Sequence, residues 1–151
     1  MISIWRIVKA KHVLTAFDGE GASQYGGRWN HPGFPVVYCS GTLSLAALEL
    51  FVQLDSASYM SLVAIEAQIS DEIPIGLLEK LPKNWNQYPA PLEAQNCGRE
   101  WIESERTVIL KVPSVIIPRE YNYILNPKHV DFNKIKIKPP TPFTFDSRMY
   151  K

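Results

Sequence analysis

The sequence has almost no excess of either charge and no long apolar run. Its 151 residues carry 16 Lys and Arg against 15 Asp and Glu, a formal net charge of +1. This argues against a dedicated nucleic-acid binder, because phosphate contacts normally leave a clear basic excess. No stretch approaches the roughly 18 apolar residues of a membrane span, and the N-terminus lacks the charged lead and apolar core of a signal peptide. We therefore expect a cytoplasmic protein that binds neither nucleic acid nor a membrane directly.

Cysteine and the familiar site motifs are equally scarce. Cys39 and Cys97 are the two cysteines and stand in no metal or redox spacing, so we expect ordinary buried or half-buried thiols. The histidines His12, His31 and His129 match no metal-ligand spacing. No Ser-His-Asp or Cys-His order follows from spacing, and the sequence contains no GxGxxG or Walker pattern. These absences predict a site without metal and without a familiar nucleotide-fold motif.

The length and the 46% hydrophobic content predict one domain over residues 1–151. Twelve prolines divide the chain into short pieces, which favours strands. We predict strands at Ile2 to Val8, Val36 to Tyr38, Ser61 to Ile69, Thr107 to Val112 and Val115 to Ile117, and an edge strand protected by lysines at Lys134 to Lys138. Two segments predict helices, Thr42 to Leu54 and Asn96 to Ser104. This pattern indicates an α+β fold with a mixed or mostly antiparallel sheet and few helices.

Five of the eight glycines lie between Gly19 and Gly33, and this segment contains the most unusual local sequence, Gly26-Gly27-Arg28-Trp29-Asn30. Two glycines allow backbone to approach a ligand, and the guanidinium of Arg28 suits an anionic group such as pyrophosphate. The alternative is a tight turn without a ligand, in which Arg28 is solvated and Trp29 packs in the core. Such a turn would have the same local sequence. The residues alone leave the two interpretations about equally supported.

Glu49 is the only charged residue in the predicted helix from Thr42 to Leu54. It shares a helical stripe with Thr42, Ala46 and Gln53, so periodicity favours a solvated face, although a stripe facing a cleft has the same pattern. Tyr38 ends a predicted strand and is by default a core aromatic with its hydroxyl at the rim. Ser114 follows Pro113, where serine usually caps a turn.

Taken in order, a series of short segments resembles the RES domain, the toxin half of bacterial RES-Xre toxin-antitoxin pairs. The segments cover most of the chain, and their order is more specific than any one of them. They are Trp5-Arg6, Gly26-Gly27-Arg28-Trp29-Asn30, Val37-Tyr38, Leu45-Ala46-Ala47-Leu48-Glu49, Leu81-Pro82 with Trp85, Gly98 and Trp101, Val112-Pro113-Ser114, Glu120-Tyr121-Asn122-Tyr123, Leu125-Asn126-Pro127 with His129, and Phe145-Asp146-Ser147-Arg148. Arg99 departs from the pattern, which has an acidic residue after this glycine.

The resemblance implies a fold similar to ADP-ribosyltransferases and an enzyme that cleaves NAD between nicotinamide and ribose. NAD is then the substrate, and no cofactor is implied. The site residues carried over are Arg28, Tyr38, Glu49 and Ser114, all present here. Arg28 would hold the pyrophosphate, Tyr38 would border the nicotinamide, Glu49 would stabilise the positive ribose, and Ser114 would hydrogen-bond the nicotinamide-ribose portion.

The resemblance also implies a partner, an Xre-type antitoxin, and allows oligomerisation within that complex. Three functions stay open. The protein is an NAD glycohydrolase, a protein ADP-ribosyltransferase that uses the same pocket, or a non-catalytic module that binds a nucleotide or a partner. The fate of the ADP-ribose separates the first two, and the release of nicotinamide separates both from the third.

Overall fold

The structure is a computed structural model that describes residues 1–55 and 61–150. Its strands are β1 (Ile2–Lys9), β2 (Val37–Ser40), β3 (Leu62–Ile69), β4 (Ile75–Leu77), β5 (Ile109–Pro113), β6 (Tyr121–Leu125), β7 (Lys136–Ile137) and β8 (Thr141–Phe143). Its α-helices are α1 (Glu20–Tyr25), α2 (Leu43–Phe51) and α3 (Leu92–Ser104). Short 3-10 helices are η1 (Ala10–Thr15), η3 (Phe132–Lys134) and η4 (Ser147–Met149).

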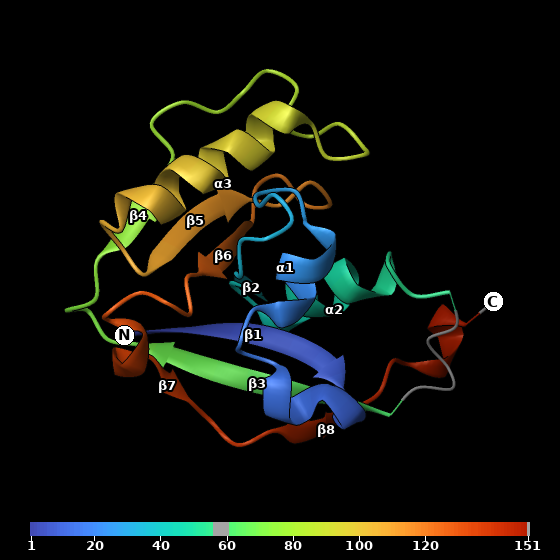
Figure 1. The fold of residues 1–151 in the computed structure, drawn as a ribbon. Helices are drawn as coiled ribbons and strands as arrows, with labels where there is room; N and C mark the ends of the chain where they lie inside the picture. The colour runs from blue at the N-terminus through green and yellow to red at the C-terminus, as the bar shows by residue number, and fades with distance from the viewer. Residues whose placement is uncertain (56–60, 151) are drawn as a thin grey trace.

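Within the described ranges, the strands form one eight-stranded sheet in the order β4-β5-β6-β2-β1-β3-β7, with β8 also paired to β3. β4 pairs with β5 in parallel, and the other strand pairs are antiparallel. β1 and β3 run side by side through the middle of Figure 1, with β7 and β8 along the lower edge. The predicted α+β fold with a mixed sheet is therefore confirmed.

Most predicted strands are present with small shifts of their ends. β1, β3 and β5 match the predicted runs within two residues at each end, and β2 begins one residue later and ends two residues later than predicted. The edge strand predicted at Lys134 to Lys138 exists as β7 but is shorter, because Lys134 closes the 3-10 helix η3. Alternation of apolar and polar residues predicted β3 and β7, and β-type runs bounded by turn residues predicted the others.

The strand predicted at Val115 to Ile117 is wrong, since these residues form the turn between β5 and β6. The hydroxyl oxygen of Ser114 accepts hydrogen bonds from the backbone N–H groups of Ile116 and Ile117, both at 3.1 Å. The backbone N–H of Ser114 donates to the carbonyl of Glu120 at 3.0 Å and closes the hairpin. A serine whose side chain hydrogen-bonds backbone groups two and three residues ahead favours a turn over the strand-to-strand hydrogen bonds of a sheet.

Both predicted helices exist. α2 begins after Thr42, whose hydroxyl caps it by accepting from the backbone N–H of Leu45 at 3.0 Å, and it ends at Phe51 rather than Leu54. α3 begins at Leu92, four residues before the predicted start. α1 was not predicted and lies inside the glycine-rich segment.

α2 and α3 cover the same face of the sheet. Ser40 in β2 lies opposite both Trp5 in β1 and Asn122 in β6, and Asn122 lies opposite Val112 in β5. Residues directly opposite one another share a face. Trp5 packs in the apolar cluster that contains Ala46 of α2, and Val112 packs in the cluster under α3. Figure 1 shows α3 above β5, with α2 farther along the sheet. The face between these helices holds Ser40 and Asn122.

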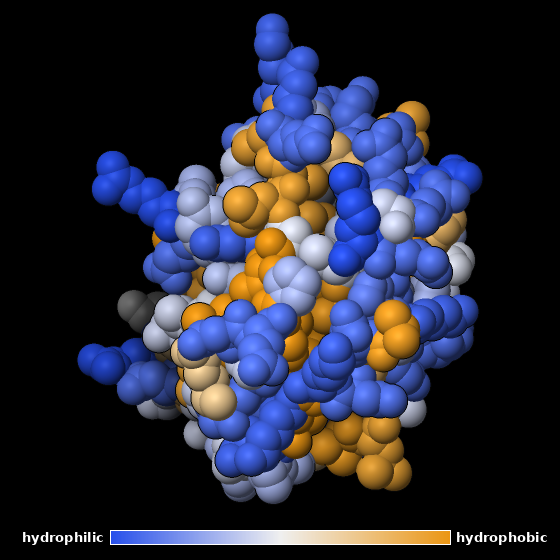
Figure 2. Space-filling model, turned by 90° about the vertical axis from the view of Figure 1, so that its left-hand side faces the viewer, coloured by the Kyte–Doolittle hydropathy of each residue, from blue (hydrophilic) through white to orange (hydrophobic). Residues whose placement is uncertain are grey.

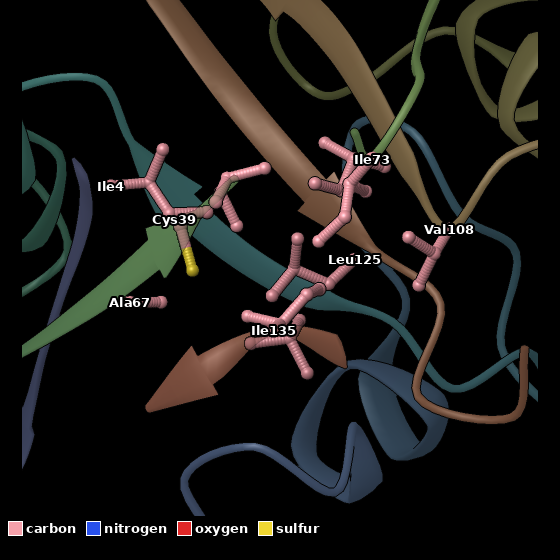
Figure 3. Packing of buried hydrophobic residues seen from close by; sticks show 10 residues of the cluster. Ile4, Cys39, Ala67, Ile73, Val108, Leu125 and Ile135 are labelled. Atoms are coloured by element: carbon pink, nitrogen blue, oxygen red, sulfur yellow. The ribbon is translucent and has the colours of Figure 1, made fainter. Parts of the chain in front are cut away.

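The opposite face carries a separate apolar cluster, and Cys39 belongs to it. Figure 3 shows Cys39 beside Ile4 and Ala67, with Leu125 and Ile135 nearby. Burial raises the pKa of the Cys39 thiol to about 12. Cys39 is buried, Cys97 is half-buried, and both are free thiols, as the sequence predicts.

One face of the molecule is partly apolar. On the face at the left of Figure 1, apolar atoms form a band that hydrophilic side chains interrupt (Figure 2). Among the helices of residues 1–55 and 61–150, none is long and apolar enough to cross a bilayer.

Candidate functional site

Glu49 projects from α2 toward the β5-β6 hairpin and is half-buried. Its Oε1 accepts a hydrogen bond from the Ser114 hydroxyl at 2.7 Å and another from the Asn122 side-chain amide at 2.8 Å. Ala46, one turn earlier on the same stripe, is buried. The stripe that periodicity assigned to solvent therefore faces the sheet at Glu49, and the interpretation of a solvated face is wrong.

Ser114 is fully buried directly after β5, and its hydroxyl has a complete set of partners. The oxygen accepts from two backbone N–H groups of the turn, and the hydroxyl proton is donated to Glu49. A serine hydroxyl offers one donor and two acceptor positions, so all three are used. The turn thereby aims the hydroxyl proton at the carboxylate.

Tyr38 in β2 ties the sheet to the glycine-rich segment. Its hydroxyl donates to Asn30 Oδ1 at 2.6 Å and accepts from the backbone N–H of Trp29 at 3.1 Å. The Asn30 amide donates in turn to backbone carbonyls of Ala22 and Phe34. Burial raises the pKa of Tyr38, so its hydroxyl keeps its proton.

Two glycines make this close packing feasible. A Cβ at Gly27 would lie 2.6 Å from the Tyr38 hydroxyl, closer than side-chain carbons approach. A Cβ at Gly98 in α3 would collide with the carbonyl oxygen of Trp29. Gly27 and Gly98 therefore let the segment around Arg28 lie between β2 and α3. Both glycines belong to the series of family motifs. A side chain at either position would clash, so the packing requires glycine at both.

Arg28 is held from the opposite side by the chain that precedes α3. Its Nη1 donates to the carbonyl oxygens of Trp85 at 2.8 Å and Gln87 at 2.6 Å. Partial burial lowers the pKa of Arg28, and the negative charge of Glu49 acts against this shift. A half-buried guanidinium within electrostatic range of a carboxylate suits a ligand that carries both a phosphate and a developing positive charge.

The sequence predicts four site residues, which are Arg28, Tyr38, Glu49 and Ser114. The structure places some of them in direct contact and others farther apart. Glu49 and Ser114 are in direct contact. Tyr38 lies two residues from Ser40 in β2 and so on the same sheet face. Arg28 and Glu49 interact through their charges without an ion pair among the described residues.

Sequence reasoning missed Asn122 as a site residue. It contacts Glu49, and its Oδ1 accepts from the hydroxyl of buried Ser40 at 2.7 Å. Its only signal in the sequence is its place in the Glu120-Tyr121-Asn122-Tyr123 segment. Within residues 1–55 and 61–150, no three His, Cys, Asp or Glu side chains gather as metal ligands would.

Comparison with known proteins identifies the family of the chain. Residues 3–146 match the RES domain family, so the chain belongs to that family, as its motifs predict. It is 38% identical to the protein named Toxin Res of Yersinia enterocolitica over 150 residues, covering 97% of this chain and 98% of the relative. It is 35% identical to the Prs ADP-ribosylating toxin of a Sphingobium strain, covering 99% and 97%. Each of these two alignments covers nearly the whole of both chains.

Solved structures agree on the fold. The Mycobacterium tuberculosis MbcT-MbcA toxin-antitoxin complex contains a chain that matches with a TM-score of 0.74, covering 95% of this chain and 84% of that one. The sequence identity is 16%, so this likeness concerns the fold alone.

Proposed function

We propose that this protein is the toxin of a toxin-antitoxin pair and an NAD glycohydrolase that cleaves the bond between nicotinamide and ribose. The observation that carries the proposal is the Glu49 carboxylate, because both of its side-chain donors bind Oε1. Among the described residues, no hydrogen-bond donor reaches Oε2. One oxygen is thus fixed by the protein, and the other is available for a ligand.

The chemistry needs a negative charge more than a proton donor. Nicotinamide in NAD is cationic, and it takes the bonding electron pair and leaves as a neutral molecule. The positive charge then develops on the ribose, and a nearby carboxylate stabilises it, as in glycoside hydrolysis. Water forms the new bond to the ribose carbon and releases a proton, giving ADP-ribose. We assign the stabilising charge and the binding of ribose hydroxyls to Glu49.

Arg28 is assigned to the pyrophosphate. A guanidinium pairs with phosphate oxygens through parallel N–H donors, which a lysine cannot reproduce. The carbonyls of Trp85 and Gln87 engage Nη1 alone, so the rest of the guanidinium edge can serve the ligand. The packing at Gly27 and Gly98 supports a preorganised position for Arg28.

Tyr38 and Ser114 receive different roles. We assign Tyr38 to the border of the nicotinamide site, with its ring as the contact, because its hydroxyl already holds Asn30 and Trp29. The resemblance implies that Ser114 hydrogen-bonds the nicotinamide-ribose portion. That contact would break one of three existing bonds, so we propose that Ser114 acts by holding Glu49.

A second candidate function is transfer of ADP-ribose to a protein. The name of the Sphingobium relative, an ADP-ribosylating toxin, supports it. The same carboxylate and guanidinium would serve both reactions, which differ in whether water or a protein side chain attacks the ribose. A non-catalytic binding module is the third candidate, and the ordered donors around Glu49 speak against it.

We also propose an antitoxin of the Xre type as the partner that restrains the activity. A cytoplasmic enzyme that destroys NAD requires such restraint, and the fold shared with the toxin-antitoxin complex supports a protein partner. A partner that places an acidic group or chain terminus against Arg28 would occupy the pyrophosphate position, and pairing with that charge would fix its register.

The test is incubation of purified protein with NAD labelled in the adenine portion. We expect nicotinamide and free ADP-ribose in equal amounts over many turnovers. Label retained on a protein would favour the transferase instead. NAD binding without release of nicotinamide would favour the binding module and overturn both enzymatic functions.

A further inference from the structure

We propose that Asn122 is a positioning residue for Glu49 and that Ser40 sets the orientation of its amide. The inference rests on the proposed function and specifies how the carboxylate of that same site is held. It begins from the strand register, which places Ser40 of β2 directly opposite Asn122 of β6. Because directly opposite side chains share a sheet face, both point to the side that α2 covers.

The hydrogen bonds between these residues have only one consistent direction. A carboxylate can only accept, so the Asn122 group that faces Glu49 at 2.8 Å must be the amide nitrogen. The amide oxygen then faces Ser40, whose hydroxyl donates to it at 2.7 Å. Ser40 is 4% exposed, so this bond has little competition from water. The buried hydroxyl therefore prevents the amide from flipping.

Glu49 Oε1 consequently has two donors, one from each arm of the β5-β6 hairpin close to its turn. Ser114 follows β5, and Asn122 lies in β6. Two donors on one oxygen anchor the carboxylate at Oε1, and Oε2 has no donor among the described residues. Without the Asn122 donor, the flexible glutamate side chain would retain a single anchor, and its charge would spend less time at the reacting ribose.

This role predicts a specific kinetic pattern for Asn122→Ala. Hydrogen bonds to charged groups are strong enough that loss of one should lower kcat by about 10- to 100-fold. KM for NAD should change much less, because the lost interaction acts on the charge that develops during bond cleavage. The effect of Asn122→Ala on kcat should also be measured in the Glu49→Gln background. There it should nearly vanish, since Asn122 acts through the Glu49 carboxylate.

Asn122→Asp keeps the shape and adds a readout that a purely structural role would not change. Glu49 faces the introduced carboxyl directly, Ser40 and Ser114 beside it stay neutral, and Arg28 contributes positive charge from farther away. The Glu49 carboxylate should raise the pKa of the introduced carboxyl above its ordinary value of about 3.9. The protonated form can donate to Oε1, whereas the ionised form repels it. We therefore compare kcat of Asn122→Asp with kcat of wild type at each pH. The ratio of the variant's kcat to the wild-type kcat should be at least about 10-fold lower at pH 8 than at pH 5.

Asn126→Asp is the matched control. Asn126 is also buried, but its Oδ1 caps the backbone N–H of Lys128, a contact that an aspartate keeps. We expect wild-type kcat and an unchanged pH profile for this variant. Equal kcat and equal pH profiles for wild type and Asn122→Asp would overturn the inference, as would an Asn122→Ala loss that persists fully with Glu49→Gln.

A measurement without NAD separates this inference from the proposed function. The side-chain amide protons of Asn122 can be followed by NMR in wild type and in Glu49→Ala. A large shift of this amide pair, with the Asn126 pair unmoved, supports the contact even if the protein consumes no NAD. An unmoved Asn122 pair would refute the contact itself, whatever the enzyme assay shows.

Discussion

Replacement of Glu49 by glutamine is the sharpest test of the site, because it removes a charge and little else. The glutamine amide retains an oxygen that can accept from Ser114 and Asn122, so the contacts to the hairpin can survive. The free energy of unfolding should change by about 0.5 kcal/mol or less. For a chain of this size, that corresponds to a Tm shift of less than about 2 °C.

The effect on catalysis should be much larger. A carboxylate about 4 Å from a developing positive charge contributes about 4 kcal/mol at an effective dielectric constant of about 20. Removal of single preorganised electrostatic groups in other enzymes costs about 2.7 to 4 kcal/mol, or about 100- to 1000-fold in rate. The two estimates agree, so we expect Glu49→Gln to release nicotinamide at least about 100-fold more slowly than wild type.

The assay is nicotinamide release from NAD, paired with thermal unfolding of each variant. Glu103→Gln is the control, since Glu103 is exposed on α3 and pairs with Arg99 of its own helix. It should keep wild-type turnover. Near-normal NAD consumption by Glu49→Gln would refute the role of the charge, and a large drop in Tm would assign Glu49 to folding instead.

Four further predictions concern Arg28, Tyr38 and the independence of turnover from metal. Arg28→Ala should lose NAD turnover and part of its affinity for the antitoxin, and a stable NAD analogue should compete with that partner; a partner that binds equally tightly at saturating analogue would contradict the shared site. Tyr38→Phe should lower the free energy of unfolding by about 1 to 3 kcal/mol, because Asn30 Oδ1 loses its donor in a buried position. Burial raises the pKa of Tyr38 in the folded state, so Tyr38 ionises at lower pH in the unfolded chain than in the folded protein. The free energy of unfolding of the wild type should therefore fall as pH rises above about 10. Denaturation curves should show a smaller fall for Tyr38→Phe, which lacks the ionisable hydroxyl. Finally, a chelator should leave NAD turnover unchanged, and a loss restored by a divalent ion would overturn the metal-free mechanism.

The local parts of the fold follow from the sequence, and the site follows only partly. β3 was predictable because apolar residues alternate along Leu62–Ile69. The turn at Val115 to Ile117 was not, because its apolar residues resemble a strand and the deciding contact is the Ser114 hydroxyl. α1 has a single turn and a half inside a glycine-rich segment, too short for a periodic signal.

The environment of Glu49 shows why periodicity alone fails at the candidate site. Helical spacing placed it with Thr42 and Gln53, which are exposed. Its partners lie 65 and 73 residues farther along the chain, in a hairpin that the sheet register brings under α2. Such long-range placement has no local signature. The ordered family motifs predict Glu49 as a site residue, and the structure adds the contacts that connect it to Asn122 and Ser40.

The most direct test of the account is the NAD content of cells that express the protein without its partner. Wild-type expression should lower cellular NAD before growth stops, and co-expression of the proposed antitoxin should prevent both effects. Cells with equal amounts of Glu49→Gln protein should keep their NAD and continue to grow. Growth arrest by wild type with unchanged NAD would contradict the proposed function.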